Sequence, residues 1–214
     1  MGTLLELKQV TAGYDGDPVL RNVSFCVEEL DFVGITGPNG GGKTTLLKVI
    51  LGLLKPSGGT VAFSVPRRDL FGYLPQQNTF DKQFPLTVED VVLSGLLSEK
   101  GIWKRYTRDD RSRAGALLEQ YGLGSYRNTP IGELSGGQAQ RAFLCRAVIA
   151  SPRVLVLDEP TTYVDAGFER EFYDLLPALN RKHTILMVSH DWDAIRSYGK
   201  TVLRVDREVQ EIHV

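Results

Sequence analysis

The sequence predicts an α/β protein with a mostly parallel sheet, and three observations lead to this class. Residues 31–36 predict a short buried strand, and the continuous apolar runs at 154–157 and 184–188 suit central parallel strands, because helices cover both faces of such strands. Between about residues 80 and 150 the apolar residues have helical spacing, and no run there favours a strand. Strands at both ends of the chain therefore flank a helical insertion.

The N-terminal part begins with a strand and continues into a loop and a helix. Residues 4–10 alternate enough in hydropathy to predict a strand, and a turn at residues 13–17 gives a hairpin-like opening. The short buried strand expected at 31–36 leads directly into a glycine-rich loop. Residues 44–54 then predict a helix, which ends before the segment Lys55-Pro56-Ser57-Gly58-Gly59.

Further helices are expected in the insertion, over residues 87–97, 107–121 and 138–149. With 214 residues and 42% hydrophobic content, the chain is long enough to bury the core of one compact domain. We therefore expect a single domain over residues 1–214. Its core is expected at about 1–78 and 151–214, and its helical subdomain at 79–150.

Composition limits the classes of partner. Lys and Arg total 25 and Asp and Glu total 26, so the net charge of -1 gives no general attraction to nucleic acid or anionic lipid. The two cysteines, Cys26 and Cys145, lie far apart, which argues against a disulfide framework or a zinc site, and both are expected to be buried. Without a signal-like start or a membrane-spanning run, the chain is expected to be cytosolic.

The glycine-rich loop predicts a triphosphate site. It reads Gly37-Pro38-Asn39-Gly40-Gly41-Gly42-Lys43-Thr44-Thr45 and follows the pattern GxxxxGK[ST]. Glycines let the backbone curl so that its N–H groups surround phosphate oxygens, and the following helix directs its positive end at the phosphates. Lys43 is expected to reach the β- and γ-phosphates, and the Thr44 hydroxyl to bind Mg²⁺. A chance match is the alternative.

A pair of carboxylates follows the apolar run Val154-Leu155-Val156-Leu157. Open α/β sheets bind ligands at the carboxyl ends of their strands, where Asp158 and Glu159 are expected. Beside a magnesium triphosphate, Asp158 can hold the metal, while Glu159 can position and deprotonate the attacking water. A solvated strand end is the alternative for such an acidic pair.

The segment Leu134-Ser135-Gly136-Gly137-Gln138 strongly resembles the signature sequence of ATP-binding cassette (ABC) ATPases. A serine and two glycines before a helix can form a second anion site, because the N–H groups at the helix start are exposed. An ordinary helix N-cap is the alternative. The resemblance covers essentially the whole chain. It implies a P-loop NTPase core with a mostly parallel sheet, an antiparallel β subdomain and an inserted helical subdomain. It also implies ATP and Mg²⁺ as cofactors.

The resemblance further implies that two copies pair head to tail, most simply as a homodimer. In such a pair Ser135, Gly137 and Gln138 of one copy close on the γ-phosphate that Lys43 of the other copy holds. The nucleotide-binding residues expected within one copy are those of the loop, namely Gly37, Asn39, Gly40, Gly41, Gly42, Lys43, Thr44 and Thr45.

Four further residues match positions of the family. Tyr14 matches the aromatic residue that stacks on adenine, although a turn tyrosine is usually packing. Gln76 matches the glutamine that senses Mg²⁺ and water, with a surface amide as the alternative. Asp165 matches the aspartate of the loop that crosses the dimer interface and also suits a helix N-cap. His190 matches the histidine that contacts the γ-phosphate.

Two histidines have no family role, and the chain departs from the family pattern at two places. His183 and His213 lack such a context and are expected on the surface. Many family members have a glycine before the nucleotide-binding strand, where this chain has Leu30-Asp31-Phe32, and Tyr163 stands where a small residue is usual. Neither change removes a catalytic group.

Three classes of function are compatible with these motifs. The favoured class is the ATPase subunit of a transporter, attached to the cytoplasmic face of the membrane through separate permease subunits. A soluble ABC-type ATPase acting on ribosomes or DNA usually has two cassettes or a long coiled coil, and no nucleic-acid partner is expected here. A non-enzymatic nucleotide switch would tolerate loss of Glu159 or His190, and both are present.

The transported substrate is suggested by similarity alone. The segment Phe84-Pro85-Leu86-Thr87-Val88 and the region around Trp103 are similar to cassettes of bacterial importers for metal ions and metal chelates, such as zinc, manganese or iron. An importer would add a substrate-binding protein to the complex. Phe80 and Phe84 are candidates for a groove that receives a permease helix, or for the core.

Overall fold

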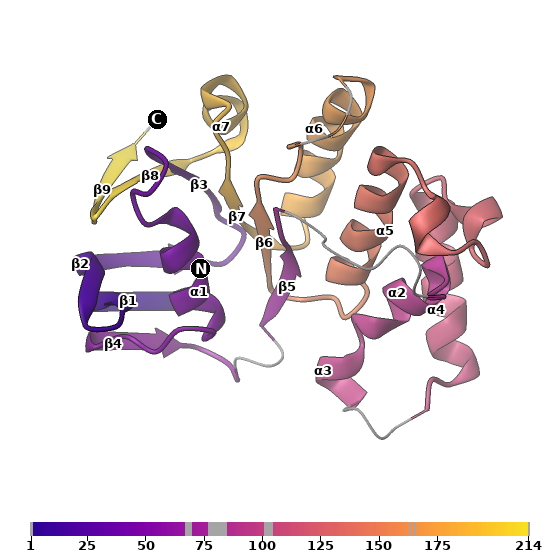
Figure 1. Ribbon diagram of the computed structural model, residues 1–214, viewed down its shortest axis with the longest axis horizontal. Coiled ribbons are helices and arrows are strands. Elements are labelled where there is room, and N and C mark those ends of the chain that lie inside the picture. The colour runs from indigo at the N-terminus through magenta and orange to yellow at the C-terminus, as the bar shows by residue number, and fades with distance from the viewer. Residues whose placement is uncertain are drawn as a thin grey trace.

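The structure is a computed structural model that describes residues 2–66, 70–76, 85–100, 105–162, 164 and 166–213. Its strands form two sheets, one antiparallel and one mostly parallel, and its helices cover the parallel sheet (Figure 1). The α/β class and the mostly parallel sheet are therefore confirmed. Within these residues, no helix combines the length and the apolar character needed to cross a bilayer.

The antiparallel sheet has three strands in the order β2-β1-β4, with β1 at Thr3–Tyr14, β2 at Asp17–Glu28 and β4 at Gly58–Phe63. Asp15 and Gly16 connect β1 to β2 with positive φ angles of 50° and 84°, as a tight hairpin turn requires. Much of β2 alternates between buried and exposed residues. Cys26 falls on the exposed face of this alternation, so the expectation that it is buried was wrong, whereas Cys145 is buried.

The second sheet has six strands in the order β5-β6-β7-β3-β8-β9, and only β9 runs antiparallel to its neighbour. The three predicted central strands are confirmed as β3, β6 and β7. Their bounds and those of the outer strands are β3 Phe32–Thr36, β5 Phe71–Leu74, β6 Val154–Asp158, β7 Thr184–Val188, β8 Thr201–Asp206 and β9 Glu208–His213. Every residue of β3, β6 and β7 is buried, as expected for strands covered on both faces.

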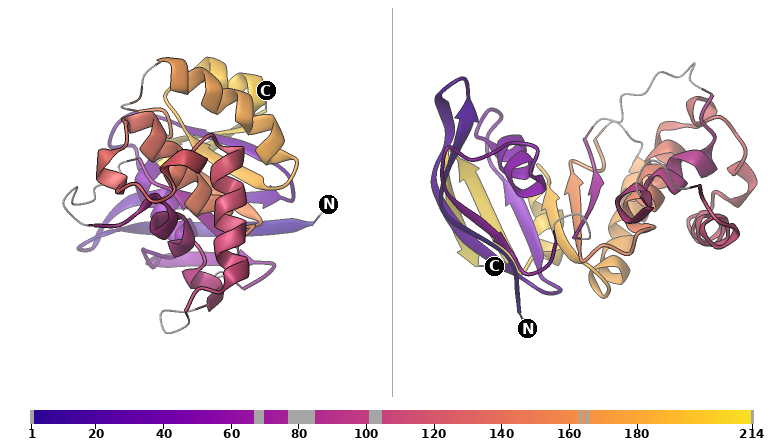
Figure 2. Two further views of the ribbon diagram at one scale, coloured as in Figure 1. Left: turned by 90° about the vertical axis from the view of Figure 1, so that its right-hand side faces the viewer. Right: turned by 90° about the horizontal axis from the view of Figure 1, so that it is seen from below.

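Two hydrophobic cores lie on the two faces of the parallel sheet. Val154 and Val156 of β6 face a core shared with helix α1 (Lys43–Leu51) and the antiparallel sheet. Leu155 and Leu157 face the other core, which is filled by helices α2 (Val88–Ser94), α4 (Arg108–Gln120), α5 (Gly136–Val148) and α6 (Ala166–Asn180). Figure 2 shows these layers edge-on, with α1 between the two sheets and the remaining helices beyond the parallel sheet.

The chain between β5 and β6 is helical, as predicted, over the residues described. The helices are α2 Val88–Ser94, α3 Leu97–Lys100, α4 Arg108–Gln120 and α5 Gly136–Val148, with short 3-10 turns at Gly124–Tyr126 and Ile131–Glu133. Thr87, Thr107 and Ser135 begin α2, α4 and α5 with reciprocal capping hydrogen bonds. The expected helix at 87–97 ends instead at Gly95, where a Cβ atom would lie 2.1 Å from the Arg146 carbonyl oxygen.

In the described part of the chain after β6 the helices are α6 at Ala166–Asn180 and α7 at Trp192–Tyr198. His183, in the turn between α6 and β7, is buried and not on the surface as expected. Its Nδ1 donates a hydrogen bond to the Pro152 carbonyl oxygen at 2.6 Å. Burial lowers the pKa of His183, so the neutral imidazole is the form that this site accommodates.

Candidate nucleotide site

The glycine-rich loop joins β3 to α1. Gly37 and Gly42 have φ angles of 144° and 106°, which side-chain-bearing residues rarely adopt. A Cβ atom at Gly37 would also lie 2.0 Å from the Val205 carbonyl oxygen of β8. The loop therefore needs glycine at these positions, both for its backbone angles and for its close contact with the sheet.

Lys43 is largely buried within the loop that precedes it. Its Nζ donates hydrogen bonds to the carbonyl oxygens of Gly37 at 2.9 Å and Pro38 at 3.1 Å. The ammonium is thus inside the curve of the loop, where phosphate oxygens could replace the two carbonyls. Thr44 is exposed beside it and Thr45 is buried, whereas Asn39 and Gly40 form the exposed tip.

Three predicted side chains meet at the carboxyl ends of the parallel strands. Glu159, just after β6, accepts a hydrogen bond from Gln76 Nε2 at 2.5 Å on Oε2. Its other oxygen, Oε1, lies 2.9 Å from His190 Nε2, just after β7. Because β6, β7 and β3 are adjacent and parallel, their carboxyl ends bring Glu159, His190 and the glycine-rich loop to one edge of the sheet.

Asp158 ends β6 and is only 4% exposed. Burial raises the pKa of its carboxyl, and the nearby Glu159 raises it further, whereas a hydrogen bond from Tyr73 and the charge of Lys43 act in the opposite direction. The Tyr73 hydroxyl donates to Asp158 Oδ2 at 3.3 Å, and burial is the main reason that the pKa of Tyr73 is raised to about 12. A cation near Asp158 would stabilise its charged form.

Two residues of this site were missed in the sequence. Tyr73 contacts Asp158, and the Thr162 hydroxyl donates to Glu159 Oε2 at 3.3 Å. Thr162 lies three residues after Glu159, and this short spacing was a usable signal. Tyr73 had none, because its contact depends on the pairing of β5 with β6, which the sequence does not reveal.

The Ser135 segment lies away from the glycine-rich loop. Ser135 caps α5, because its hydroxyl oxygen accepts a hydrogen bond from the Gln138 N–H. In turn, Gln138 Oε1 accepts a hydrogen bond from the Ser135 N–H at 3.0 Å. Helix α5 belongs to the core on one face of the parallel sheet and α1 to the core on the other. A single chain therefore does not bring Ser135 and Gly137 to Lys43.

Tyr14 ends β1 and is 43% exposed. Lys48 of α1 lies 5.4 Å from the ring centroid and donates a hydrogen bond to the hydroxyl at 3.2 Å. The ring is thus held against α1 and remains partly open to solvent. Asp165 and Tyr163 lie outside the described residues, as do Phe80 and Phe84.

Comparison with known proteins identifies the family. The family model described as ABC transporter matches residues 20–162. The chain is 39% identical to the zinc uptake system ATP-binding protein ZurA of Listeria innocua, over 98% of the chain and 85% of that protein. It is 41% identical to the high-affinity zinc uptake system ATP-binding protein ZnuC of Bacillus subtilis, over 95% and 91%.

Solved structures of ABC transporter cassettes resemble this chain and agree with the family assignment. The dimeric ABC transporter cassette MJ0796 superposes with a TM-score of 0.83 at 30% identity, over 98% of each chain. The cassette MJ1267 superposes with a TM-score of 0.85 at 26% identity, over 100% of this chain and 92% of that one. The chain therefore belongs to the ABC transporter family as an ATP-binding, ATP-hydrolysing cassette.

Proposed function

We propose that this chain is the ATPase subunit of a metal-ion importer, with zinc as the first candidate substrate. The observation that carries the catalytic part is the meeting of Gln76, Glu159 and His190 beside Asp158 and the glycine-rich loop. The choice of zinc rests on relatives named for zinc uptake, such as ZurA and ZnuC. Neither the composition nor these relatives favour ribosomes or DNA.

Within this function each side chain has a proposed role. Lys43 and the N–H groups of the loop bind the phosphates, and Tyr14 stacks on adenine. Glu159 takes a proton from the attacking water, and His190 donates to an oxygen of the γ-phosphate. Asp165 contacts the second copy, which stays a prediction from the resemblance.

The residues around Asp158 suit Mg²⁺. The donors are oxygens, namely the Thr44 hydroxyl, the buried Asp158 carboxylate and the amide oxygen of Gln76, whose nitrogen is already bonded to Glu159. Among the residues described, no group of three or more His, Cys, Asp or Glu could hold a metal unaided. One carboxylate completed by substrate phosphates is typical of Mg²⁺, which would neutralise phosphate charge in the reaction.

A head-to-tail pair of chains would complete the site. Because α1 and α5 pack on opposite faces of the sheet, the exposed start of α5 at Ser135 is available to a second copy. The N–H groups at a helix start suit a phosphate. In this arrangement Ser135, Gly137 and Gln138 of one copy close on the nucleotide that Lys43 holds in the other.

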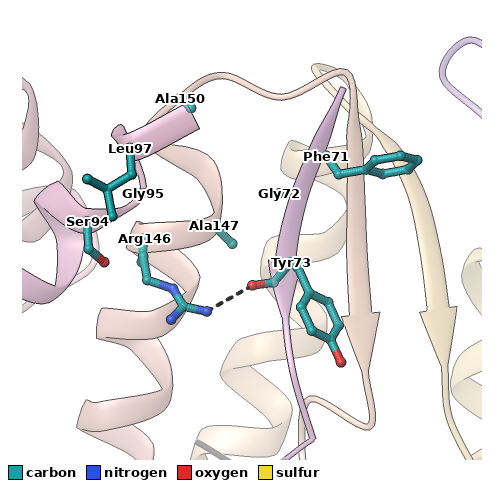
Figure 3. Close-up of a pocket in the computed structure, with 9 residues that line it drawn as sticks. All are labelled: Phe71, Gly72, Tyr73, Ser94, Gly95, Leu97, Arg146, Ala147 and Ala150. Atoms are coloured by element: carbon teal, nitrogen blue, oxygen red, sulfur yellow. Dashed lines mark hydrogen bonds between the residues drawn. The ribbon is translucent and has the colours of Figure 1, made fainter. Parts of the chain in front are cut away.

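A hollow of about 350 Å³ between β5 and the helical segment is the proposed contact for a permease helix. Figure 3 shows its walls, formed by β5, the junction of α2 and α3, and α5, with Arg146 directed toward the Tyr73 carbonyl. Leu97 is 42% exposed at its rim. An apolar helix that carries a carboxylate would suit Leu97 and Arg146, and the permease would hold the chain on the cytoplasmic face of the membrane.

Affinity purification tests the assignment. The tagged chain is purified from detergent-solubilised native membranes, and the proteins that accompany it are identified by mass spectrometry. We expect a polytopic membrane protein and a substrate-binding protein. Uptake of zinc, manganese and iron is then compared between cells with the wild-type chain and cells with Glu159→Gln. Ribosomal partners with unchanged metal uptake would contradict the proposal.

A further inference from the structure

Tyr73 contacts both the hollow proposed for the permease helix and the Asp158 carboxylate, which is proposed to bind Mg²⁺. Its backbone carbonyl oxygen accepts a hydrogen bond from Arg146 Nη2 at 3.3 Å, on the wall of the hollow. Its phenol hydroxyl donates to Asp158 Oδ2 at 3.3 Å. In Figure 3 the carbonyl of Tyr73 faces Arg146, whereas its ring lies on the other side of β5. One residue therefore contacts both regions.

The pairing of β5 with β6 explains why the phenol reaches Asp158. Tyr73 pairs with Val156, and the strands are parallel. Side chains two residues apart share a face, so Asp158 lies on the same face as Val156, one step further along β6. This is the face on which α1 packs, with Lys43 at its first turn. The long tyrosine side chain spans this step, and a shorter residue would not.

Strand β5 packs closely against helix α5. A Cβ atom at Gly72 would lie 2.0 Å from the Ala147 carbonyl oxygen, so the strand backbone lies directly against α5. Two residues beyond β5, Gln76 bonds Glu159. The strand thus holds a partner for each of the two carboxylates.

We propose that Tyr73 is a positioning residue for Mg²⁺ binding, whose hydroxyl holds Oδ2 of Asp158 so that Oδ1 serves the cation. The inference rests on the proposed function, because it requires Asp158 to be a metal ligand. A carboxylate without this bond can rotate, and loss of such a partner commonly weakens metal binding 10–100-fold. Tyr73 itself touches neither the nucleotide nor the reacting atoms in this proposal.

Nucleotide binding without turnover tests this role. Calorimetric titration of the β,γ-imido analogue of ATP is performed on the full chain, in EDTA and at increasing Mg²⁺. For Tyr73→Phe we expect the affinity for the analogue in EDTA to be unchanged. The Mg²⁺ concentration that gives half of the Mg²⁺-dependent increase in affinity should be about 10-fold higher than for wild type. Tyr121→Phe removes a buried hydroxyl from the helical segment and should leave both values unchanged.

A double-mutant cycle with Asp158→Asn identifies the route of the effect. If Tyr73 acts through Asp158, Tyr73→Phe should change Mg²⁺ dependence less than twofold in the Asp158→Asn background. Equal Mg²⁺ dependence of wild type and Tyr73→Phe would overturn the inference, as would an undiminished effect in that background. Should Tyr73→Phe not fold, Tyr73→Met carries the same test. Absence of any nucleotide binding by the wild-type chain would instead refute the proposed function.

Discussion

The imidazole Nε2 of His190 lies 2.9 Å from Oε1 of Glu159. The two residues follow neighbouring parallel strands, so the sheet itself places them together. Gln76 and Thr162 bond the other oxygen of the same carboxylate. Glu159 is therefore held on both oxygens, and each partner can be tested separately.

Replacing His190 with Ala should slow ATP hydrolysis by about 100-fold or more while ATP affinity stays within about twofold. The reason is that His190 fixes Glu159 and is proposed to stabilise charge that develops in the reaction. Steady-state hydrolysis and equilibrium nucleotide binding would measure both quantities. His213→Ala, in β9, is the matched control. Hydrolysis at the wild-type rate in His190→Ala would contradict the assignment.

Glu159→Gln should produce ATP-bound dimers that barely hydrolyse. The amide keeps the shape of the side chain and can still accept from Gln76, but it cannot take a proton. We expect kcat to fall by about 100-fold or more, with dimers that appear only with ATP. Size-exclusion chromatography with light scattering would detect them, and a variant that stays monomeric at saturating ATP would exclude head-to-tail closure.

Lys43→Ala should weaken ATP binding by at least about 10-fold, because the variant loses a charge-assisted contact with the phosphates. Lys43 is largely buried in its loop, whereas Lys8 is an exposed lysine of β1 paired with Glu6. Lys8→Ala is therefore the control for loss of a positive charge. Binding of a fluorescent ATP analogue measures both variants, and full affinity in Lys43→Ala would remove this lysine from the phosphate site.

Gly72→Ala should destabilise the protein by several kcal/mol, because its Cβ would lie 2.0 Å from the Ala147 carbonyl oxygen. Gly58→Ala offers a comparison in β4, where the nearest atom to the new Cβ is 3.7 Å away. That change should stay within about 0.5 kcal/mol. Urea unfolding would measure the difference. Similar stabilities for the two variants would mean that β5 does not require this close contact.

Acidification should destabilise the protein partly through His183. Burial lowers its pKa in the folded state, so below the unfolded value of about 6.5 the unfolded chain takes up a proton more readily. Its contribution is present above that pH and is lost as the pH falls, by at most about 1.4 kcal/mol per pH unit. The free energy of unfolding should therefore differ less between pH 7.5 and pH 5.5 in His183→Gln than in wild type. Equal differences would exclude this role.

The central strands could be predicted from the sequence because residues buried on both faces leave a continuous apolar run. Val154 to Leu157 is such a run, and β6 follows it. The bounds of helices were less predictable. Gly95 follows the last residue of α2, and its close approach to the Arg146 carbonyl of α5 leaves no room for a Cβ atom. This restriction exists only once α5 has packed, so the sequence alone does not reveal it.

The candidate site was predictable where motif residues follow strands and unpredictable where strands pair. Gln76, Glu159 and His190 were all proposed from the sequence, and the structure brings their side chains into contact. Tyr73 was not identified, because its position depends on the register of β5 against β6. Cys26 and His183 were assigned the wrong environment for the same kind of reason. The exposure of Cys26 on β2 and the burial of His183 in the turn before β7 depend on tertiary packing and not on residue type.

The opposite placement of α1 and α5 has a genetic consequence if two chains form each site. An allele defective at Lys43 and another defective at Ser135 would each yield homodimers with two impaired sites. A mixed dimer would combine both defects in one site and leave the other site intact. Two inactive alleles expressed in one cell could thus restore partial transport, whereas two alleles that both alter α1 could not.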